Sequence, residues 1–182
     1  MTDTQFTIPE QFESQLRHVD ALDSRTDAQI IDDPSKYTPT TSSEKNIWTF
    51  WHSGIRHMPW WSQRNICDLA RINGPSWTIR VLDYDPESPN YALKYIEPDL
   101  LPKCFVDRTM DGKTARPHQA DMLRGAALWK YGGVWIDCGC IPLRSLEDMC
   151  WRELEDSNSP YRIAAPYMFD SVSAQISPLE FC

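Results

Sequence analysis

The sequence is poor in the features that mark membrane, secreted and zinc-binding proteins. No apolar run approaches the roughly 18–20 residues that a membrane-spanning helix needs. The N-terminus lacks a basic start followed by an apolar core, so no signal peptide is predicted. None of the six cysteines forms a Cys-x-x-Cys pair, and their spacing fits no zinc module. As it stands, the sequence predicts a cytoplasmic protein without a membrane span.

Basic residues are also scarce. The formal net charge is −8 at pH 7, which disfavours binding to nucleic acids and to anionic membrane surfaces. The charge is uneven, because residues 1–44 hold nine acidic residues and only three basic ones. This stretch has few aromatic residues, and residues 33–43 are rich in turn formers. We therefore predict that residues 1–44 form an acidic, disordered arm.

Hydrophobic residues make up 41% of the 182 residues, and eight of them are tryptophan, so the chain can build one domain with a real core. The elements predicted from periodicity and turn residues are strands over 46–50, 77–83 and 163–165, and helices over 59–72 and 145–155. A strand, a helix and a second strand at this spacing predict a βαβ unit with parallel strands. The fold class is therefore α/β.

Segment 115–144 carries the clearest functional pattern. Pro117 suits the first turn of a helix, and Gly132-Gly133 suits its end, because glycine readily takes the left-handed conformation found there. Residues 134–136 are all apolar and predict a short strand in the interior of a sheet. Asp137 follows at the carboxyl end of this strand, which is where open α/β sheets bind their ligands.

Asp121 and Arg124 are three residues apart on the predicted helix, so they are neighbours on its surface. With Asp137 they offer carboxylates for sugar hydroxyls or a divalent cation, and a guanidinium that binds phosphate in a bidentate way. A solvated ion pair on an amphipathic helix explains any one of these residues equally well. The complete ordered block favours a site in which all three reach one ligand.

Two blocks of this segment resemble glycosyltransferases with a DXD sugar-binding region. The blocks are Ala-Asp-Met-Leu-Arg over 120–124 and Tyr-Gly-Gly-Val-Trp-Ile-Asp over 131–137. Similar blocks occur in the family 32 mannosyltransferases and in the glycosylating domains of the large clostridial toxins. Residues 47–54, Ile-Trp-Thr-Phe-Trp-His-Ser-Gly, with Met58-Pro59, resemble the opening of the capsular polysaccharide synthesis proteins of fungi and bacteria.

This resemblance implies a GT-A-like nucleotide-diphospho-sugar transferase fold, incomplete at its C-terminus. It implies a donor-binding region over residues 45–168 and a short tail over residues 169–182, with the remainder of the family's domain missing. Many relatives act in the Golgi and the secretory pathway, so an N-terminus longer than the one given would imply that location.

The resemblance also assigns roles by position. Trp51 is similar to the aromatic residue that stacks on the nucleotide base, Asp121 to the aspartate that faces the ribose, and Arg124 to the arginine near the diphosphate. Asp137 is similar to the first DXD aspartate, which contacts the ribose and, through Mn²⁺ or Mg²⁺, the diphosphate. The third DXD position is Gly139, which has no ligand atom. Asp137 is therefore the one metal ligand that the resemblance assigns.

Together these patterns predict a glycosyltransferase that moves a hexose from a nucleoside diphosphate sugar to a hydroxyl of a glycan or another acceptor. The setting would be polysaccharide biosynthesis of the capsular type. The alternative is a non-catalytic, truncated paralogue that binds a nucleotide-sugar or pairs with a complete relative, and Gly139 favours that alternative.

Two further features stay open at the level of sequence. Trp60 and Trp61 are expected to pack in the core, although aromatic rings also stack on sugars. His52 and His57 flank the end of the first predicted strand. We expect them to be surface residues, with a general base as the alternative.

Overall fold

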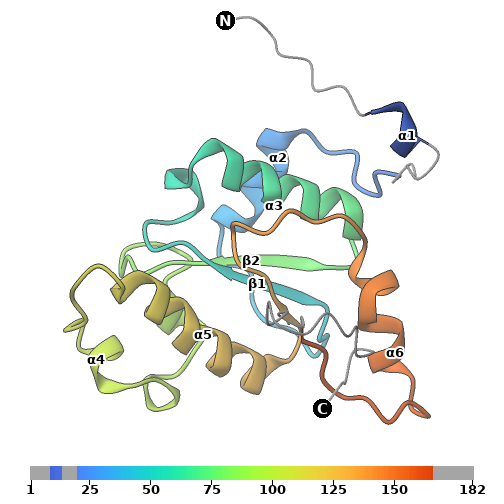
Figure 1. Ribbon diagram of the computed structural model, residues 1–182. Helices are drawn as coiled ribbons and strands as arrows, with labels where there is room; N and C mark the ends of the chain where they lie inside the picture. Colours follow the sequence, from blue (N-terminus) through green and yellow to red (C-terminus); the bar gives the residue numbers. More distant parts are fainter. Residues whose placement is uncertain (1–8, 14–19, 166–182) are drawn as a thin grey trace, which may run out of the picture.

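The structure is a computed structural model that describes residues 9–13 and 20–165. At its centre lies a sheet of order β2-β1-β3, in which both neighbours run parallel to β1. The strands are β1 (Asn46–Phe50), β2 (Thr78–Leu82) and β3 (Val134–Trp135), and the two long helices are α3 (Trp60–Asn73) and α5 (Ala115–Tyr131). α3 connects β1 to β2, so the predicted βαβ unit and the α/β class are confirmed. Figure 1 shows α3 and α5 on opposite sides of the sheet.

The remaining elements are short. They are α1 (Glu10–Glu13), α2 (Asp27–Asp32), η1 (Asp33–Ser35), η2 (Ile55–His57), η3 (Ala92–Lys94), η4 (Pro98–Leu100), α4 (Lys103–Val106), the π-helical turn η5 (Glu147–Trp151) and α6 (Arg152–Glu155). Ser145 caps the last helical segment as predicted, because its Oγ accepts a hydrogen bond of 3.2 Å from the backbone N–H of Asp148. The predicted strand over 163–165 is wrong. In the described part of the chain these residues have no strand conformation and belong to no sheet.

Two apolar clusters fill the space on either side of the sheet. Successive side chains of a strand point to opposite faces, so β1 contributes to both. Trp48 and Phe50 join the cluster on the α5 side, which includes Leu123. Ile47 joins the cluster on the α3 side, which includes Ile66. All five residues of β1 are buried, so its sequence shows no strict alternation of apolar and polar residues.

β3 occupies a different position from the one the sequence predicted. It was expected inside the sheet, but within the described residues it pairs only with β1 and is an edge strand with half-buried side chains. The turn from α5 into β3 is made by Gly132 and Gly133, whose φ angles are 64° and 90°. A Cβ atom on Gly133 would lie 2.4 Å from the backbone oxygen of Asn46. Glycine therefore allows β3 to reach β1.

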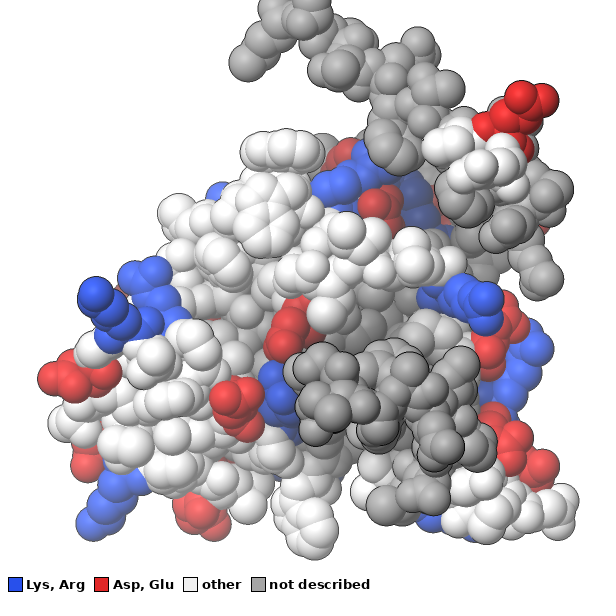
Figure 2. Space-filling view, viewed as in Figure 1, with Lys and Arg blue, Asp and Glu red and all other residues white. Residues whose placement is uncertain are grey.

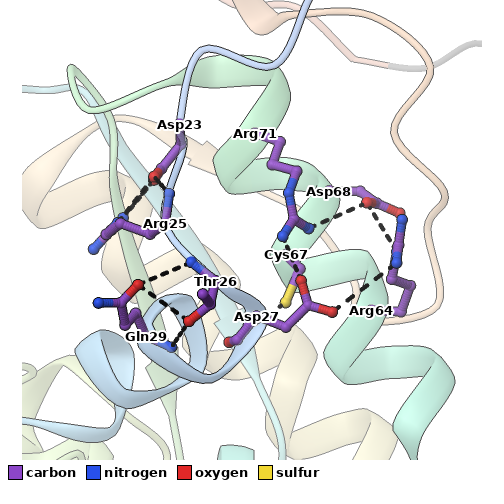
Figure 3. A network of polar contacts seen from close by, with 9 residues as sticks. All are labelled: Asp23, Arg25, Thr26, Asp27, Gln29, Arg64, Cys67, Asp68 and Arg71. Atoms are coloured by element: carbon purple, nitrogen blue, oxygen red, sulfur yellow. Dashed lines mark hydrogen bonds and ion pairs between the residues drawn. The ribbon is translucent and has the colours of Figure 1, made fainter.

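Residues 20–44 pack on the body of the protein, which differs from the arm that composition suggested. Thr26 starts α2 with a capping box to Gln29, and Ile30 is 1% exposed against the α3 side. Arg80 of β2 donates hydrogen bonds to the backbone oxygens of Thr38 and Pro39. Acidic residues of this stretch form ion pairs with arginines, one of which, Arg71, lies on α3 (Figure 3). Composition alone gives the number of charges but not these partners.

Two tryptophans expected in the core lie at the surface. Trp60 and Trp61 do not pack in the core, since they are 80% and 47% exposed. On the face shown in Figure 2, acidic and basic side chains are interspersed, and no continuous basic surface for a polyanion is visible. Within the described part of the chain, no helix combines the length and the apolar character needed to cross a bilayer.

Candidate functional site

The carboxyl ends of the three parallel strands meet at one edge of the sheet. Trp51 follows β1, Asp83 follows β2, and Asp137 comes two residues after β3. α5 runs back along the sheet to deliver the chain to the start of β3, so its N-terminal half lies at the same edge. In parallel α/β sheets this edge is the usual place for a ligand.

Arg124 stands between two carboxylates at this edge. Its Nη2 lies 3.3 Å from Oδ1 of Asp121, and 3.2 and 3.3 Å from Oδ1 and Oδ2 of Asp137. The side chains of Asp121, Arg124 and Asp137 are 60%, 41% and 59% exposed, so a ligand can reach all three from solvent. The structure thus brings together three residues that the sequence selected, while their roles toward a ligand stay predictions.

Trp135 is the residue of this cluster that sequence analysis missed. Its indole Nε1–H donates a hydrogen bond of 2.8 Å to Oδ1 of Asp137. The guanidinium of Arg124 lies over the same ring, 5.7 Å from its centroid, which is a cation–π contact. Trp135 and Asp137 are two residues apart, so they share one face of the extended chain. That spacing was the signal available in the sequence.

The guanidinium of Arg124 retains donors that the protein does not use. An arginine carries five N–H donors, and the contacts to both aspartates are made through Nη2. Its Nε is buried and has no hydrogen-bond partner among the described residues. Among the described residues nothing hydrogen-bonds to Nη1, whereas Nη2 is held in place by the two carboxylates.

The turn after β3 is supported from the α3 side. The backbone N–H of Cys140 bonds to the oxygen of Asp137 at 2.9 Å, and Asn65 of α3 donates to the backbone oxygen of Cys138 at 3.0 Å. The buried Cys138 thiol donates to the backbone oxygen of Phe50 at 3.2 Å, and burial raises its pKa. Cys138 is therefore a packing residue that fixes the turn carrying Asp137.

Trp51 lies at the same edge but on the other side of the sheet. It is half-buried and packs against the α3-side cluster, whereas Asp137 and Trp135 contact Arg124 of α5. The alternation of β1 explains this, because Phe50 already points to the α5 side. The structure therefore places Trp51 apart from the other three candidates, and base stacking by Trp51 stays a prediction.

His52 follows Trp51 and lies on the α5 side. It is half-buried, so it is only partly at the surface, and its ring centroid is 5.5 Å from that of Tyr84. Burial lowers the pKa of His52, and the positive charges of Arg116 and Arg108 lower it further. Both effects favour the neutral imidazole over the charged form. His57 is exposed, as predicted, and its Nδ1 lies 2.7 Å from the backbone oxygen of Ser53.

The residues around Asp137 do not fit a divalent metal centre built by the protein. Asp137 already contacts Arg124 and Trp135. Gly139 has no side-chain ligand atom, and no heavy atom lies within 4 Å of the position that a Cβ would take there. Within residues 9–13 and 20–165, no group of three or more His, Cys, Asp or Glu side chains could hold a metal ion.

Comparisons with known proteins agree on one family. Residues 2–153 match the family described as capsular polysaccharide synthesis protein. The chain is 48% identical over 169 residues to the probable glycosyltransferase FCK3 of Fusarium pseudograminearum, covering 93% of this chain and 43% of the relative. It is 44% identical to the O-glycosyltransferase braB of Annulohypoxylon truncatum over 80% of this chain and 34% of the relative.

A third relative is the glycosyltransferase afumC of Aspergillus fumigatus, which is 43% identical over 77% of this chain and 36% of its own length. The chain thus spans less than half the length of these relatives. No solved structure shows a significant match. The resemblance drawn from the blocks at 47–54, 120–124 and 131–137 is confirmed by these matches.

Proposed function

Because the chain belongs to the family of capsular polysaccharide synthesis proteins, we propose that it is the donor-binding part of a glycosyltransferase. The reaction transfers a hexose from a nucleoside diphosphate sugar to a hydroxyl group of a glycan or another acceptor. Three relatives that are 42–44% identical to this chain carry the name glycosyltransferase or O-glycosyltransferase, which supports this reaction class. The GT-A-like fold, the donor-binding role of residues 45–168 and the acceptor are parts of the same proposal.

The observation that carries the proposal is the position of Arg124 between Asp121 and Asp137 at the carboxyl edge of the sheet. The two carboxylates and the Trp135 ring hold the guanidinium in one orientation. A fixed guanidinium stabilises the negative charge that develops on a leaving diphosphate, because it needs no reorganisation during the reaction. Arg124 is therefore assigned to the diphosphate.

The two carboxylates are assigned to the hydroxyl groups of the donor. Ionised carboxylates only accept hydrogen bonds, and sugar and ribose hydroxyls are suitable donors. Holding the sugar by its hydroxyls places its anomeric carbon toward the acceptor, and such positioning carries much of the rate enhancement in bimolecular transfers. The new bond forms between this carbon and the acceptor oxygen, the bond to the diphosphate oxygen breaks, and the acceptor hydroxyl releases its proton to the departing diphosphate or to water.

Donor binding is tested by thermal unfolding of the full chain with a panel of UDP- and GDP-sugars, each with and without Mn²⁺. A ligand that binds only the folded state at a hundredfold excess over its Kd adds about 2.7 kcal/mol of stability. For a chain of this size, that corresponds to a rise in Tm of about 5–10 °C. We expect one donor to raise Tm and Asp137→Asn to reduce the rise strongly.

The matched control is Asp148→Asn. Asp148 is similarly exposed and pairs with Arg152 at 2.8 Å, but it lies on the last helical segment rather than at the candidate site. This variant should keep the full ligand-induced shift. An equal shift in Asp137→Asn and in the unchanged protein would contradict the assignment, and so would a cooperatively folded protein that no donor stabilises.

A further inference from the structure

A hollow of about 520 Å³ lies between α2 and α3, separate from the Arg124 cluster. It is lined by Asp27, Ile31, Trp60, Gln63, Arg64 and Cys67. Trp60 stands at the first position of α3 and is 80% exposed, although a tryptophan normally buries most of its area. This exposed ring borders the hollow, and an aromatic face can stack on an apolar ligand surface.

Three polar side chains beside this ring have unused hydrogen-bonding capacity. Gln63 uses its amide nitrogen for the backbone oxygens of Ile55 and Met58, and no described residue donates a hydrogen bond to its Oε1. Arg64 uses its Nε for Asp68, while its Nη1 is 4.0 Å from Asp27, too far for a hydrogen bond. Nη1 therefore pairs with Asp27 by charge alone, and no described residue accepts a hydrogen bond from Nη2.

Asp27 completes the set from the α2 side. Arg71 contacts its Oδ1 and lowers the pKa of the carboxyl, so Asp27 is ionised at neutral pH. Its Oδ2 forms an ion pair with Nη1 of Arg64 at 4.0 Å (Figure 3), a distance too long for a hydrogen bond. The hollow thus presents a flat apolar ring, two acceptors and one donor group within one small area.

We infer that this hollow binds a neutral sugar ring of a glycan, with its apolar face stacked on Trp60 and its hydroxyls bonded to Asp27, Gln63 and Arg64. Adjacent sugar hydroxyls both donate and accept, so a mixture of carboxylate, amide and guanidinium matches them. A few polar groups beside an apolar surface are typical of sites that fix the orientation of a ligand.

The local charge excludes a nucleotide as the preferred ligand. Asp27 and Asp68 balance Arg64 and Arg71, so a diphosphate would approach two carboxylates along with the two guanidinium groups (Figure 3). A neutral glycan meets no such repulsion. The site is therefore distinct in charge from the Arg124 cluster, whose guanidinium is assigned to the diphosphate.

The hollow lies close to the edge at which the donor is proposed to bind. α3 follows the loop after the carboxyl end of β1, so Trp60 at its first position is near this edge, on the α3 side of the sheet. The Arg124 cluster lies on the α5 side. A glycan held at the hollow would therefore lie on the other side of the sheet and would not compete for the donor site.

The test is saturation-transfer difference NMR on the full chain with maltohexaose, cellohexaose and mannohexaose, without nucleotide. We expect at least one of these glycans to bind, with the largest transfer to ring C–H protons. Trp60→Ala should weaken binding on the order of tenfold, because a stacked aromatic ring is lost. Arg64→Ala should also weaken it, and neither variant should lower Tm appreciably, since both side chains are exposed.

The matched control is Trp129→Ala, because Trp129 is 83% exposed on α5 and does not line the hollow. It should leave glycan binding unchanged. Asp137→Asn should also leave it unchanged, so failure of the donor site and failure of the glycan site give different results. Equal binding in Trp60→Ala and in the unchanged protein would overturn the inference, as would the absence of binding by all three glycans.

Discussion

Trp135 joins the two oppositely charged partners at the candidate donor site. Its indole N–H holds one oxygen of Asp137, and its ring lies under the guanidinium of Arg124. A carboxylate and a guanidinium on an exposed surface gain little from pairing alone, because solvent screens them and their side chains are flexible. A third residue that contacts both removes part of this flexibility before the ligand arrives.

This contact leads to a prediction for Trp135→Phe. The substitution keeps an aromatic ring under Arg124 but removes the hydrogen bond to Asp137. A hydrogen bond to a charged group contributes about 1.5–3 kcal/mol, so the Kd of the stabilising nucleotide-sugar should rise by roughly tenfold to a hundredfold. Isothermal titration calorimetry measures this, with Trp129→Phe on the same chain as the unaffected control. An unchanged Kd would show that Trp135 does not position Asp137.

At the scale of elements, the junction between α5 and β3 places the candidate site. Gly132 ends the helix, and Gly133 carries the chain past the start of β1 into β3. The pairing of Ile47 with Val134 then sets the register of β3, and this register determines where Asp137 emerges. Glycine is required at position 133 by close approach of two backbone segments and by the positive φ.

Gly133→Ala should therefore be strongly destabilising. A Cβ would lie 2.4 and 2.9 Å from the backbone oxygens of Asn46 and Glu44, and the left-handed conformation adds strain. We expect a loss of at least about 1–3 kcal/mol, measured by urea denaturation.

Gly125→Ala is the matched control for this substitution. Gly125 lies inside α5, and no atom lies within 4 Å of the position that an added methyl group would take, so alanine should stabilise the helix by about 0.5–1 kcal/mol. Equal effects of the two substitutions would contradict the close approach at Gly133.

At the scale of the whole molecule, the free energy of unfolding depends on pH through the buried carboxyl of Asp83. Asp83 is 2% exposed at the end of β2, where Ser88 donates a hydrogen bond to it and the backbone N–H of Asp85 donates another at 3.2 Å. Burial nevertheless raises the pKa of Asp83, because desolvation outweighs these bonds. Exposed acids such as Asp27 behave in the opposite way, since their arginine partners lower the pKa.

The raised pKa of Asp83 predicts a pH dependence of unfolding. The folded state binds the proton of Asp83 more tightly than the unfolded state, so this contribution is present below the unfolded pKa of about 3.9. It is lost as pH rises through the folded pKa. Asparagine does not titrate, so Asp83→Asn does not lose this stabilising contribution as pH rises. The free energy of unfolding of Asp83→Asn minus that of the unchanged protein should therefore increase from acidic to neutral pH. Urea denaturation across that range measures the difference, and a difference independent of pH would refute the role of Asp83.

Much of the fold could be predicted because its signals are local. The alternation of strand, helix and strand predicted the parallel unit of β1, α3 and β2. The three-residue spacing of Asp121 and Arg124 predicted their contact, because the α-helix has a fixed period. The Gly-Gly pair and the apolar run after it predicted the end of α5 and the start of β3.

Features that depend on distant partners were not predictable in this way. The packing of residues 20–44 depends on arginines such as Arg71 and Arg80, which come later in the chain. The edge position of β3 depends on which strands pair beside it within the described residues. The exposure of Trp60 depends on the path of α2 beside α3, since hydrophobic character alone favours burial.

The sequence by itself determined the α/β class, the family and the three charged residues of the candidate site, because each follows from short-range order along the chain. The predicted tail over 169–182 lies outside the described residues. Tertiary structure alone decided that Trp135 links Arg124 to Asp137, that Trp51 points to the other side of the sheet, and that Trp60 borders an open hollow. The reason is physical: side-chain contacts between segments far apart in the chain depend on how helices pack on the sheet, and no local pattern specifies that packing.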